Sequence, residues 1–283
     1  MEIITRFAPS PTGRLHLGHA WAAHSAFSSS EGDDTKVILR MEDIDHTRCR
    51  PEFTDGIFED LSWLGYSWQT PIRTQSQHYS DYAKVVIDLL QRGLAYGCTL
   101  SRSDLNAGKR TIAPDSPSHS ETGRICERLR RAAQYKTPSL PFAVRLNLNA
   151  ALRRVPTNLP YTDGGDVKHA LPPLVDWAAS NRPDPIIARR DIATSYHIAV
   201  THDDHLQGIT RIVRGEDLQD QTPLHVLIQH LMGWETPRYG HHPLITDETG
   251  RKLSKTHKDL TIQFLRESGM SPDDVLSLAR GLL

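Results

Sequence analysis

Two histidines three residues apart follow a proline-rich loop near the start of the chain. They are His16 and His19 in PSPTGRLHLGHA, and the small and apolar residues from about Leu15 predict a helix there. The N-terminus of a helix attracts anions, and Gly18 leaves room for a flat group beside the backbone. We interpret the segment as a site for a nucleoside triphosphate whose phosphates accept from the imidazoles. A helix start with two surface histidines is the alternative.

A second motif, KLSKT, occupies residues 252–256 within the polar stretch DETGRKLSKTHKD. Lys252 and Lys255 are three residues apart, so one ordered turn would direct both ammonium groups at the same phosphates. Lysine suits this task because it is a compact charge on a flexible stem. Taken alone, the segment also fits a solvated basic loop.

The segments that must position these groups alternate between strands and helices. This alternation predicts an α/β fold with a parallel sheet and crossover helices. The expected strands are residues 3–7, 36–41, 142–146 and 186–188 and the segment ITRIVR; helices are expected from about residues 15, 51, 77 and 222, with stops at Gly65 and Gly93, and two short helices after residue 256.

The middle of the chain differs in character. Residues from about 98 to 140 are polar with little periodicity, apart from GRICERLRRAAQYK, which could form one short basic helix. We interpret residues 98–185 as an insertion into the α/β domain. The basic residues within 124–136 could contact RNA or form a solvated helix face.

Composition narrows the class of protein. The 283 residues are 38% hydrophobic and 24% charged, which is typical of a globular chain and excludes a disordered or fibrous one. No apolar run approaches the roughly 20 residues that span a bilayer, and the N-terminus lacks a secretory signal. Three cysteines therefore indicate reduced thiols and a cytoplasmic protein. A net charge of -1 neither supports nor excludes RNA binding.

The two motifs together resemble the paired HIGH and KMSKS motifs of class I aminoacyl-tRNA synthetases. RFAPSPTGRLHLGHA, RMEDID and SYHIAV followed by DDHLQGITRIVRGEDL resemble the catalytic domain of a glutamyl-tRNA synthetase, over roughly residues 1–97 and 185–260. The resemblance implies ATP and Mg²⁺ as co-substrate and metal. It also implies a Rossmann-like catalytic domain in two halves, 1–97 and 186–240, an inserted α+β subdomain of the acceptor-end type at 98–185, and the KLSKT loop with a short helical tail at 241–283.

The resemblance also implies a set of site residues. Glutamate has one ammonium and two carboxylates, so its pocket needs cations, which guanidinium forks supply, and at least one anion, such as Glu42. The catalytic residues implied are His16, His19, Lys252 and Lys255, with His16, Gly18, His19 and Lys255 holding ATP. The glutamate-binding residues implied are Arg6, Phe7, Ala8, Pro9, Ser10, Glu42, Tyr196 and Arg214.

A full glutamyl-tRNA synthetase continues into an anticodon-binding domain, which we do not expect here. Truncated members of the family, the glutamyl-queuosine tRNA(Asp) synthetases, esterify glutamate to the queuosine base of tRNA(Asp). We therefore expect L-glutamate and queuosine-containing tRNA(Asp) as partners, no membrane or DNA, and a monomer. The alternatives are a minimal enzyme charging the 3′ end of tRNA(Glu), an inactive RNA-binding paralogue, and a small-molecule adenylating enzyme.

Metal sites are weakly indicated. Members of this truncated group often carry zinc in the insertion. Cys98 and Cys126 could be remnants of such a site, but two thiolates cannot complete the four ligands that structural zinc prefers. His119 lies in a Ser/Pro-rich loop and is expected at the surface, so we predict no zinc. The acidic turn residues Asp43, Asp45, Glu216 and Asp217 could place Mg²⁺ or ribose, or could cap turns.

Overall fold

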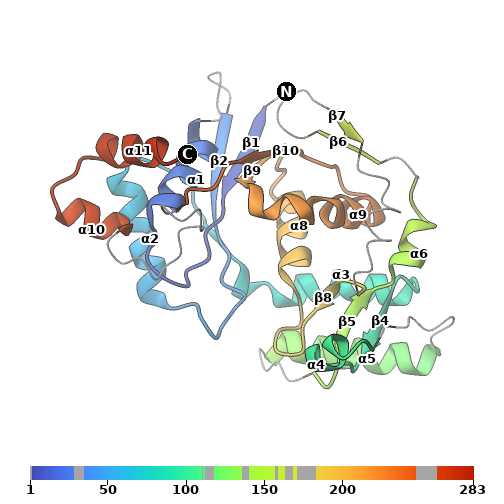
Figure 1. The fold of residues 1–283 in the computed structure, drawn as a ribbon. Coiled ribbons are helices and arrows are strands. Elements are labelled where there is room, and N and C mark those ends of the chain that lie inside the picture. The colour runs from blue at the N-terminus through green and yellow to red at the C-terminus, as the bar shows by residue number, and fades with distance from the viewer. Residues whose placement is uncertain are drawn as a thin grey trace.

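A parallel sheet opens the chain, as the strand–helix alternation predicts. The computed structural model describes residues 2–28, 35–109, 111, 118–135, 140–156, 159–162, 168–170, 183–246 and 260–283. Strand β1 (Ile3–Phe7) pairs in parallel with β2 (Thr35–Met41), which pairs in parallel with β3 (Arg73–Thr74). Crossover helices α1 (Leu17–Ser28) and α2 (Pro51–Trp63) connect these strands (Figure 1).

Two strands from the last third of the chain form a second parallel sheet beside β1. Strand β9 (Arg211–Gly215) pairs in parallel with β10 (Arg238–His242). The backbone N–H of Thr210 donates to the carbonyl oxygen of Ile4 at 2.9 Å, and Arg6 donates to the carbonyl oxygen of Val213 at 3.3 Å. These contacts place β9 beside β1, so the two parallel sheets, of order β3-β2-β1 and β9-β10, lie edge to edge. Ligands in such sheets bind where the strand order reverses, here between β1 and β9.

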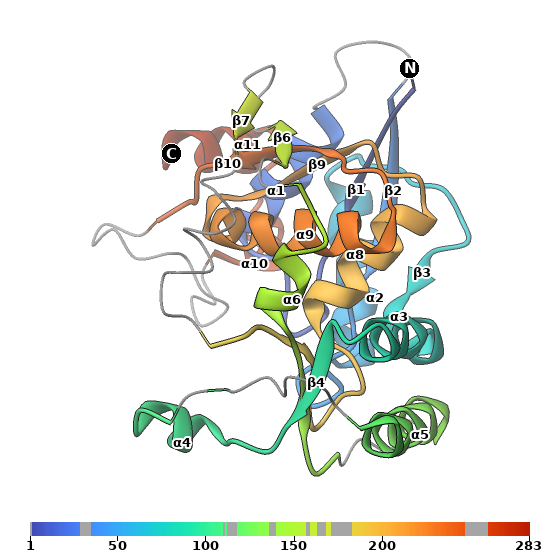
Figure 2. The same cartoon turned by 90° about the vertical axis from the view of Figure 1, so that its right-hand side faces the viewer.

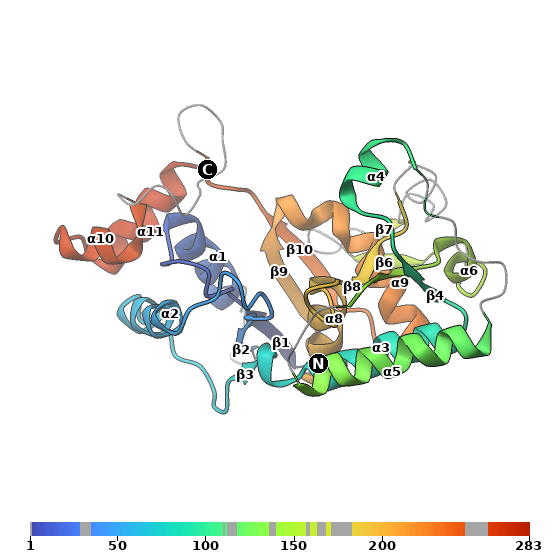
Figure 3. The same cartoon turned by 90° about the horizontal axis from the view of Figure 1, so that it is seen from below.

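Helices cover both faces of this sheet. Figure 1 and Figure 3 show α1 and α2 on one side, and α8 (Tyr196–Leu206) and α9 (Thr222–Met232) on the other. Helix α2 begins at a proline and is followed by Gly65 with φ of 85°, a conformation that glycine adopts without steric cost. The helix starts and stops expected near Pro51, Gly65 and Thr222 are confirmed.

An antiparallel sheet follows β3. The chain passes through η1 (Gln75–Gln77) and α3 (Tyr79–Gln91) into β4 (Ala95–Cys98), which pairs with β5 (Ala143–Leu146), which pairs with β8 (Ile186–Ala188). Figure 2 shows this part of the molecule below the parallel sheet. The elements between and around these strands are α4 (Arg102–Asn106), α5 (His119–Tyr135), α6 (Leu148–Leu152) and the paired strands β6 (Pro160–Thr162) and β7 (Lys168–Ala170).

The basic helix expected within GRICERLRRAAQYK is present, but it is longer than expected and a second helix was missed. Helix α5 has 17 residues and starts at His119, and α4 precedes it. The polar composition concealed a narrow apolar stripe, in which Ile125, Leu129 and Ala132 are buried where α5 packs along α3 (Figure 3).

The C-terminal helices dock onto the start of α1. After β9 the chain forms η2 (Glu216–Gln221), and it ends in α10 (Ile262–Glu267) and α11 (Pro272–Gly281), the two short helices expected. The backbone N–H of Ile262 donates to the carbonyl oxygen of Leu15 at 3.0 Å, and Thr261 forms an isolated antiparallel bridge with His16. The segment 247–259, which contains KLSKT, lies outside the described residues. No helix in the described part of the chain is both long and apolar enough to cross a bilayer.

Candidate active site

The HLGH segment straddles the start of α1. His16 directly precedes the helix, is 7% exposed, and lies with its ring centroid 3.9 Å from that of His19. Nδ1 of His16 accepts from the backbone N–H of Gly18 at 3.1 Å, and Nδ1 of His19 accepts from the backbone N–H of His16 at 3.1 Å. Each neutral ring therefore carries its proton on Nε2. Both imidazoles present an N–H donor, which is what phosphate oxygens require.

Steric contact with the His16 ring explains why position 18 is a glycine. A Cβ atom at position 18 would lie 3.0 Å from Cε1 and 3.2 Å from Nδ1 of His16, closer than nearly all real Cβ contacts. A larger residue would therefore displace the His16 ring. We expected Gly18 to leave room for a ligand, and it also leaves room for the imidazole ring of His16.

The loop between β1 and α1 carries the remaining residues of the expected glutamate site. Phe7 is buried in the core and Ala8 is half-buried. The carbonyl oxygen of Pro9 accepts from the backbone N–H of Glu42 at 3.0 Å, which ties the loop to the end of β2. Ser10 is exposed, and its carbonyl oxygen accepts from the backbone N–H of Thr12 at 2.8 Å.

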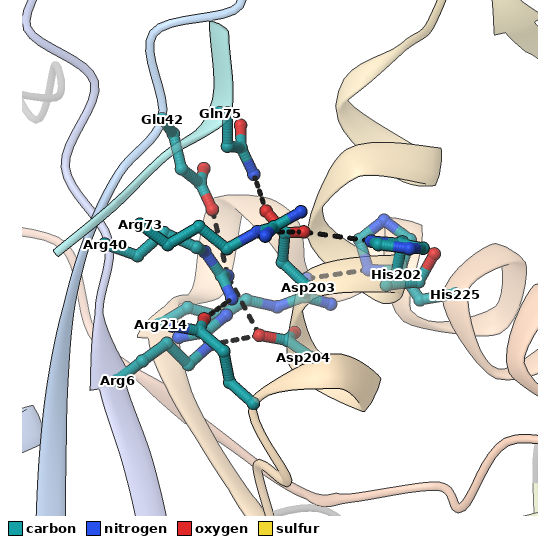
Figure 4. A network of polar contacts seen from close by, with 12 residues as sticks. Arg6, Arg40, Glu42, Arg73, Gln75, His202, Asp203, Asp204, Arg214 and His225 are labelled. Atoms are coloured by element: carbon teal, nitrogen blue, oxygen red, sulfur yellow. Dashed lines mark hydrogen bonds and ion pairs between the residues drawn. The ribbon is translucent and has the colours of Figure 1, made fainter. Parts of the chain in front are cut away.

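A buried ion network joins the carboxyl ends of β1 and β2 to α8. Nε of Arg6 lies 3.1 Å from Oδ1 of Asp204, and Arg40, which is fully buried, contacts the same oxygen at 2.9 Å (Figure 4). Arg40 also contacts Oε1 of Glu42 at 3.1 Å and donates to Gln207 at 2.9 Å. Asp204 therefore holds two arginines, and Arg40 in turn orients the carboxylate of Glu42.

Asp203, the neighbour of Asp204 on α8, binds a second set of polar side chains. Its carboxylate lies 2.7 Å from Nε of Arg73 and accepts from Gln75 at 3.1 Å and from the hydroxyl of Tyr82 at 2.8 Å. Burial opposes ionisation of Asp203, but hydrogen bonds from His202 and Tyr82 and the charges of Arg40 and Arg73 lower its pKa. The pair Asp203–Asp204 thus fastens α8 to β1, β2 and β3.

The sequence reasoning missed Arg40, Asp203 and Asp204 as site residues. One signal was present, because Arg40 lies between apolar residues in the strand VILRM, where a charged side chain needs a buried partner. Its partner lies 164 positions later, and nothing in the local pattern identifies it.

Arg214, near the end of β9, is held on three sides. Its Nε donates to His241 at 3.3 Å, its Nη1 lies 3.0 Å from Nδ1 of His225, and its Nη2 donates to the Thr222 hydroxyl at 2.7 Å. The guanidinium also lies over the Tyr239 ring, 5.1 Å from its centroid. A guanidinium has five N–H groups, so these three contacts leave one N–H on each terminal nitrogen without a partner in the described part of the chain. That is the pattern needed for a bidentate carboxylate.

Tyr196 is the first residue of α8. The hydroxyl of Ser195 caps the helix by accepting from the backbone N–H of Ile198 at 3.5 Å. The cap fixes where α8 begins and thereby positions Tyr196 over the carboxyl ends of the strands.

The electrostatics of Tyr196 show which groups surround it. Burial raises the pKa of its hydroxyl, and the carboxylates of Glu42 and Asp204 raise it further, while Arg214 and Arg6 oppose them. Of the expected glutamate-binding side chains, Arg6, Glu42, Tyr196 and Arg214 are thus brought together at the point where the strand order reverses.

A cleft of about 480 Å³ opens beside this cluster. It lies between residues that follow β5 or precede β8 and residues of α8, η2 and α9. Its lining residues are Leu148, Pro183, Pro185, Tyr196, His197, Asp220, Gln221 and Leu224.

Where their contacts are described, Asp43 and Glu216 tie their turns to other segments, whereas Asp45 binds within its own turn. Asp43 accepts from the backbone N–H and the hydroxyl of Ser76 at 2.7 and 2.6 Å. Asp45 accepts from the Thr47 hydroxyl at 2.6 Å and from Arg48 at 2.7 Å, and these bonds lower its pKa to about 2. Glu216 accepts from the backbone N–H of Leu244 at 3.3 Å.

No group of three or more His, Cys, Asp or Glu within the described ranges could hold a metal ion. Cys98 and Cys126 are both buried free thiols, and burial raises the pKa of Cys126, which disfavours the thiolate that zinc needs. The described residues therefore offer no acidic cluster for Mg²⁺, and the absence of zinc stays a prediction. Lys252 and Lys255 lie outside the described residues.

A parallel sheet of this order, with paired histidines at the first helix and an arginine–carboxylate pocket at the strand ends, is the arrangement of a class I synthetase catalytic domain. The family model described as tRNA synthetases class I (E and Q), catalytic domain, matches residues 2–282. The Glutamyl-Q tRNA(Asp) synthetase of Rhodobacter capsulatus is 36% identical over 280 residues, which cover 98% of this chain and 99% of that protein.

Longer relatives match as well. A glutamate–tRNA ligase of Coprothermobacter proteolyticus is 33% identical over 274 residues, covering 96% of this chain and 56% of that protein, so the chain spans about half of its length. A solved structure of a glutamate tRNA ligase from Elizabethkingia meningosepticum, in complex with its amino acid, superposes with a TM-score of 0.65 at 26% identity and covers 92% of this chain and 53% of that one. The chain therefore belongs to the class I glutamyl- and glutaminyl-type tRNA synthetase family, whose members are ligases.

Proposed function

We propose that this site activates L-glutamate with ATP. The observation that carries the proposal is the convergence of Arg6, Glu42, Tyr196 and Arg214: Arg6 and Glu42 are joined through Asp204 and Arg40, and the rings of Tyr196 and His225 place Arg214 beside them. Arg6 and Arg40 pair with the carboxylates of Glu42 and Asp204, and Arg214 beside them gives the cluster one excess positive charge. Glutamate carries one net negative charge and balances it, whereas glutamine would leave it uncompensated.

In the first step a glutamate carboxylate oxygen attacks the α-phosphorus of ATP. A P–O bond forms to glutamate and the bond to the β-phosphate oxygen breaks, which yields glutamyl-adenylate and pyrophosphate. Positioning and charge stabilisation supply the catalysis, without a covalent enzyme intermediate. The Nε2–H groups of His16 and His19 donate to phosphate oxygens, and Mg²⁺, when bound, neutralises charge on the phosphates.

Lys252 and Lys255 belong to the proposal through their motif, since KLSKT resembles the KMSKS motif of the family that the chain matches. We assign the two ammonium groups to stabilising the charge that develops on the phosphates.

In the second step glutamate is transferred to the queuosine base of tRNA(Asp). A nucleoside hydroxyl attacks the carbonyl carbon of the adenylate, and AMP leaves. The name, full-length match and 36% identity of the Rhodobacter capsulatus relative support this acceptor. The 33% identity to glutamate–tRNA ligases supports the alternative, transfer to the 3′ end of tRNA(Glu). The proposal includes a cytoplasmic location, where tRNA and ATP are found, and a monomeric state.

The test is charging with [¹⁴C]glutamate at mildly acidic pH, where the ester survives. The acceptors are queuosine-containing tRNA(Asp), unmodified tRNA(Asp) and tRNA(Glu). Label on the modified tRNA(Asp) alone is the expected result. Label on tRNA(Glu) would replace the proposed acceptor with the alternative, and no glutamate-dependent exchange of pyrophosphate into ATP would overturn the activation step.

A further inference from the structure

An open hollow of about 750 Å³ lies between the end of α3, helix α5 and helix α6. It shares no lining residue with the cluster around Tyr196. Its lining residues are Leu90, Gln91, Arg92, Gly93, Leu94, His119, Thr122, Gly123, Cys126, Arg130, Asn147, Ala150, Arg153 and Arg154. We call it the arginine hollow.

The ionisable side chains that line the arginine hollow are all basic. Four arginines and one histidine line it, and no aspartate or glutamate does, although the whole chain has a net charge of -1. Low-dielectric walls lined by one sign of charge concentrate the field and attract the opposite charge.

The four guanidinium groups differ in how they are held. Arg92 donates to the carbonyl oxygen of Leu231 and pairs with Asp88, both at 2.8 Å, so it is oriented by the fold. Arg130 lies 3.9 Å from Glu127, at the limit of an ion pair. Arg153 and Arg154 are exposed and make no ion pair within the described ranges.

Helix α5 carries cationic side chains on two faces, one that lines the arginine hollow and one that does not. His119, Gly123, Cys126 and Arg130 recur at helical spacing along the hollow. Three other arginines of the same helix, Arg124, Arg128 and Arg131, are exposed and do not line it. The helix therefore offers a control in which equal charge is removed elsewhere.

We propose that the arginine hollow binds backbone phosphates of an RNA strand. Guanidinium forks match phosphate oxygens in geometry as well as charge. The lining includes no Phe, Tyr or Trp on which a base could stack, so the hollow holds the backbone and does not read bases. The inference rests on the proposed function for its RNA partner and adds where part of that partner is held.

The test compares two triple variants that remove the same charge. R130A/R153A/R154A empties the hollow of three cations, and R124A/R128A/R131A removes three from outside it. Binding of an unmodified tRNA(Asp) transcript is measured by fluorescence anisotropy from 50 to 200 mM salt. Each lost phosphate contact lowers the slope of log affinity against log salt by about 1, so the first variant should lose about 2–3 in slope and on the order of tenfold in affinity.

The outcomes separate this inference from the proposed function. Equal losses in the two variants, or no binding by the wild type, would overturn the arginine hollow as an RNA site. Restoration by R130K/R153K/R154K, which keeps the charge, supports it and excludes misfolding as the cause. Inorganic pyrophosphate at matched ionic strength should not release the RNA; release would make this a site for free polyphosphate. Glutamate-dependent pyrophosphate exchange, which tests the proposed function, should stay unchanged in all three variants.

Discussion

Nη1 of Arg214 lies 3.0 Å from Nδ1 of His225, and this contact determines the protonation of a buried histidine pair. A guanidinium can only donate, so Nδ1 of His225 accepts and its proton is on Nε2. That proton points to Nδ1 of His197, 3.1 Å away, which must therefore accept. Burial and Arg214 lower the pKa of His225 well below 6.5 and that of His197 to about 4, so both rings are neutral at pH 7.

His225 should therefore act as a positioning residue for Arg214. We expect His225→Leu to raise KM for glutamate at least tenfold, since a hydrogen bond to a charged group contributes about 1.5–3 kcal/mol. KM for ATP should change little. His225→Asn, whose side-chain oxygen can still accept from Arg214, should retain more of the glutamate affinity. Steady-state pyrophosphate exchange measures both constants, and a parallel rise in both would indicate general disruption instead.

Glu42 should make glutamate binding sensitive to acid. Burial raises the pKa of Glu42 above its usual 4.5, although Arg40 and Arg6 oppose the shift. As pH falls toward this raised pKa, the carboxylate gains a proton and loses its attraction for the substrate ammonium, so KM for glutamate should rise. Glu42→Gln should show a high KM that no longer varies with pH. An equally steep pH profile in the variant would assign the titration to another group.

Asp60 in α2 should weaken the fold at neutral pH. It is fully buried, neither carboxylate oxygen has a hydrogen-bond partner among the described residues, and burial raises its pKa to about 6. A folded-state pKa above the unfolded value of 3.8 means that the charged form costs stability above pH 6, and that this loss is relieved as pH falls toward 4.

Asp60→Asn removes the buried charge. We expect it to raise the free energy of unfolding by about 1–2 kcal/mol at pH 7.5 and to leave it almost unchanged at pH 4. Urea unfolding at the two pH values measures the difference. A gain of the same size at both would mean that the carboxyl group is not ionised in the folded protein at pH 7.5.

Lys255 should be required for activation and dispensable for folding. Loss of one donor to a developing charge typically lowers the rate by about 10²–10³-fold, so Lys255→Ala should reduce pyrophosphate exchange by that factor with an unchanged Tm. Lys258→Ala, a change of the same kind three residues later, is the matched control. Near-normal exchange in the Lys255 variant would remove this lysine from the mechanism.

The local sequence pattern predicted most elements of the sheet and its helices. Strand β1, strand β2 and helix α2 fall within two residues of the expected bounds, because period-3.6 and apolar-run signals depend only on neighbouring residues. Helix α5 was underestimated for the same reason. Its buried residues are few, and their burial depends on α3, which lies some forty positions earlier.

By itself, the sequence determined the alternating α/β architecture, the HLGH helix start and the residue types of the pocket, since these follow from spacing and side-chain chemistry. Only the tertiary structure decided that β9 lies beside β1, that Asp204 holds both Arg6 and Arg40, and that neutral His225 orients Arg214. These contacts join segments up to about two hundred positions apart. Their partners are selected by packing and by the cost of burying an unpaired charge, and neither leaves a periodic signal in the chain.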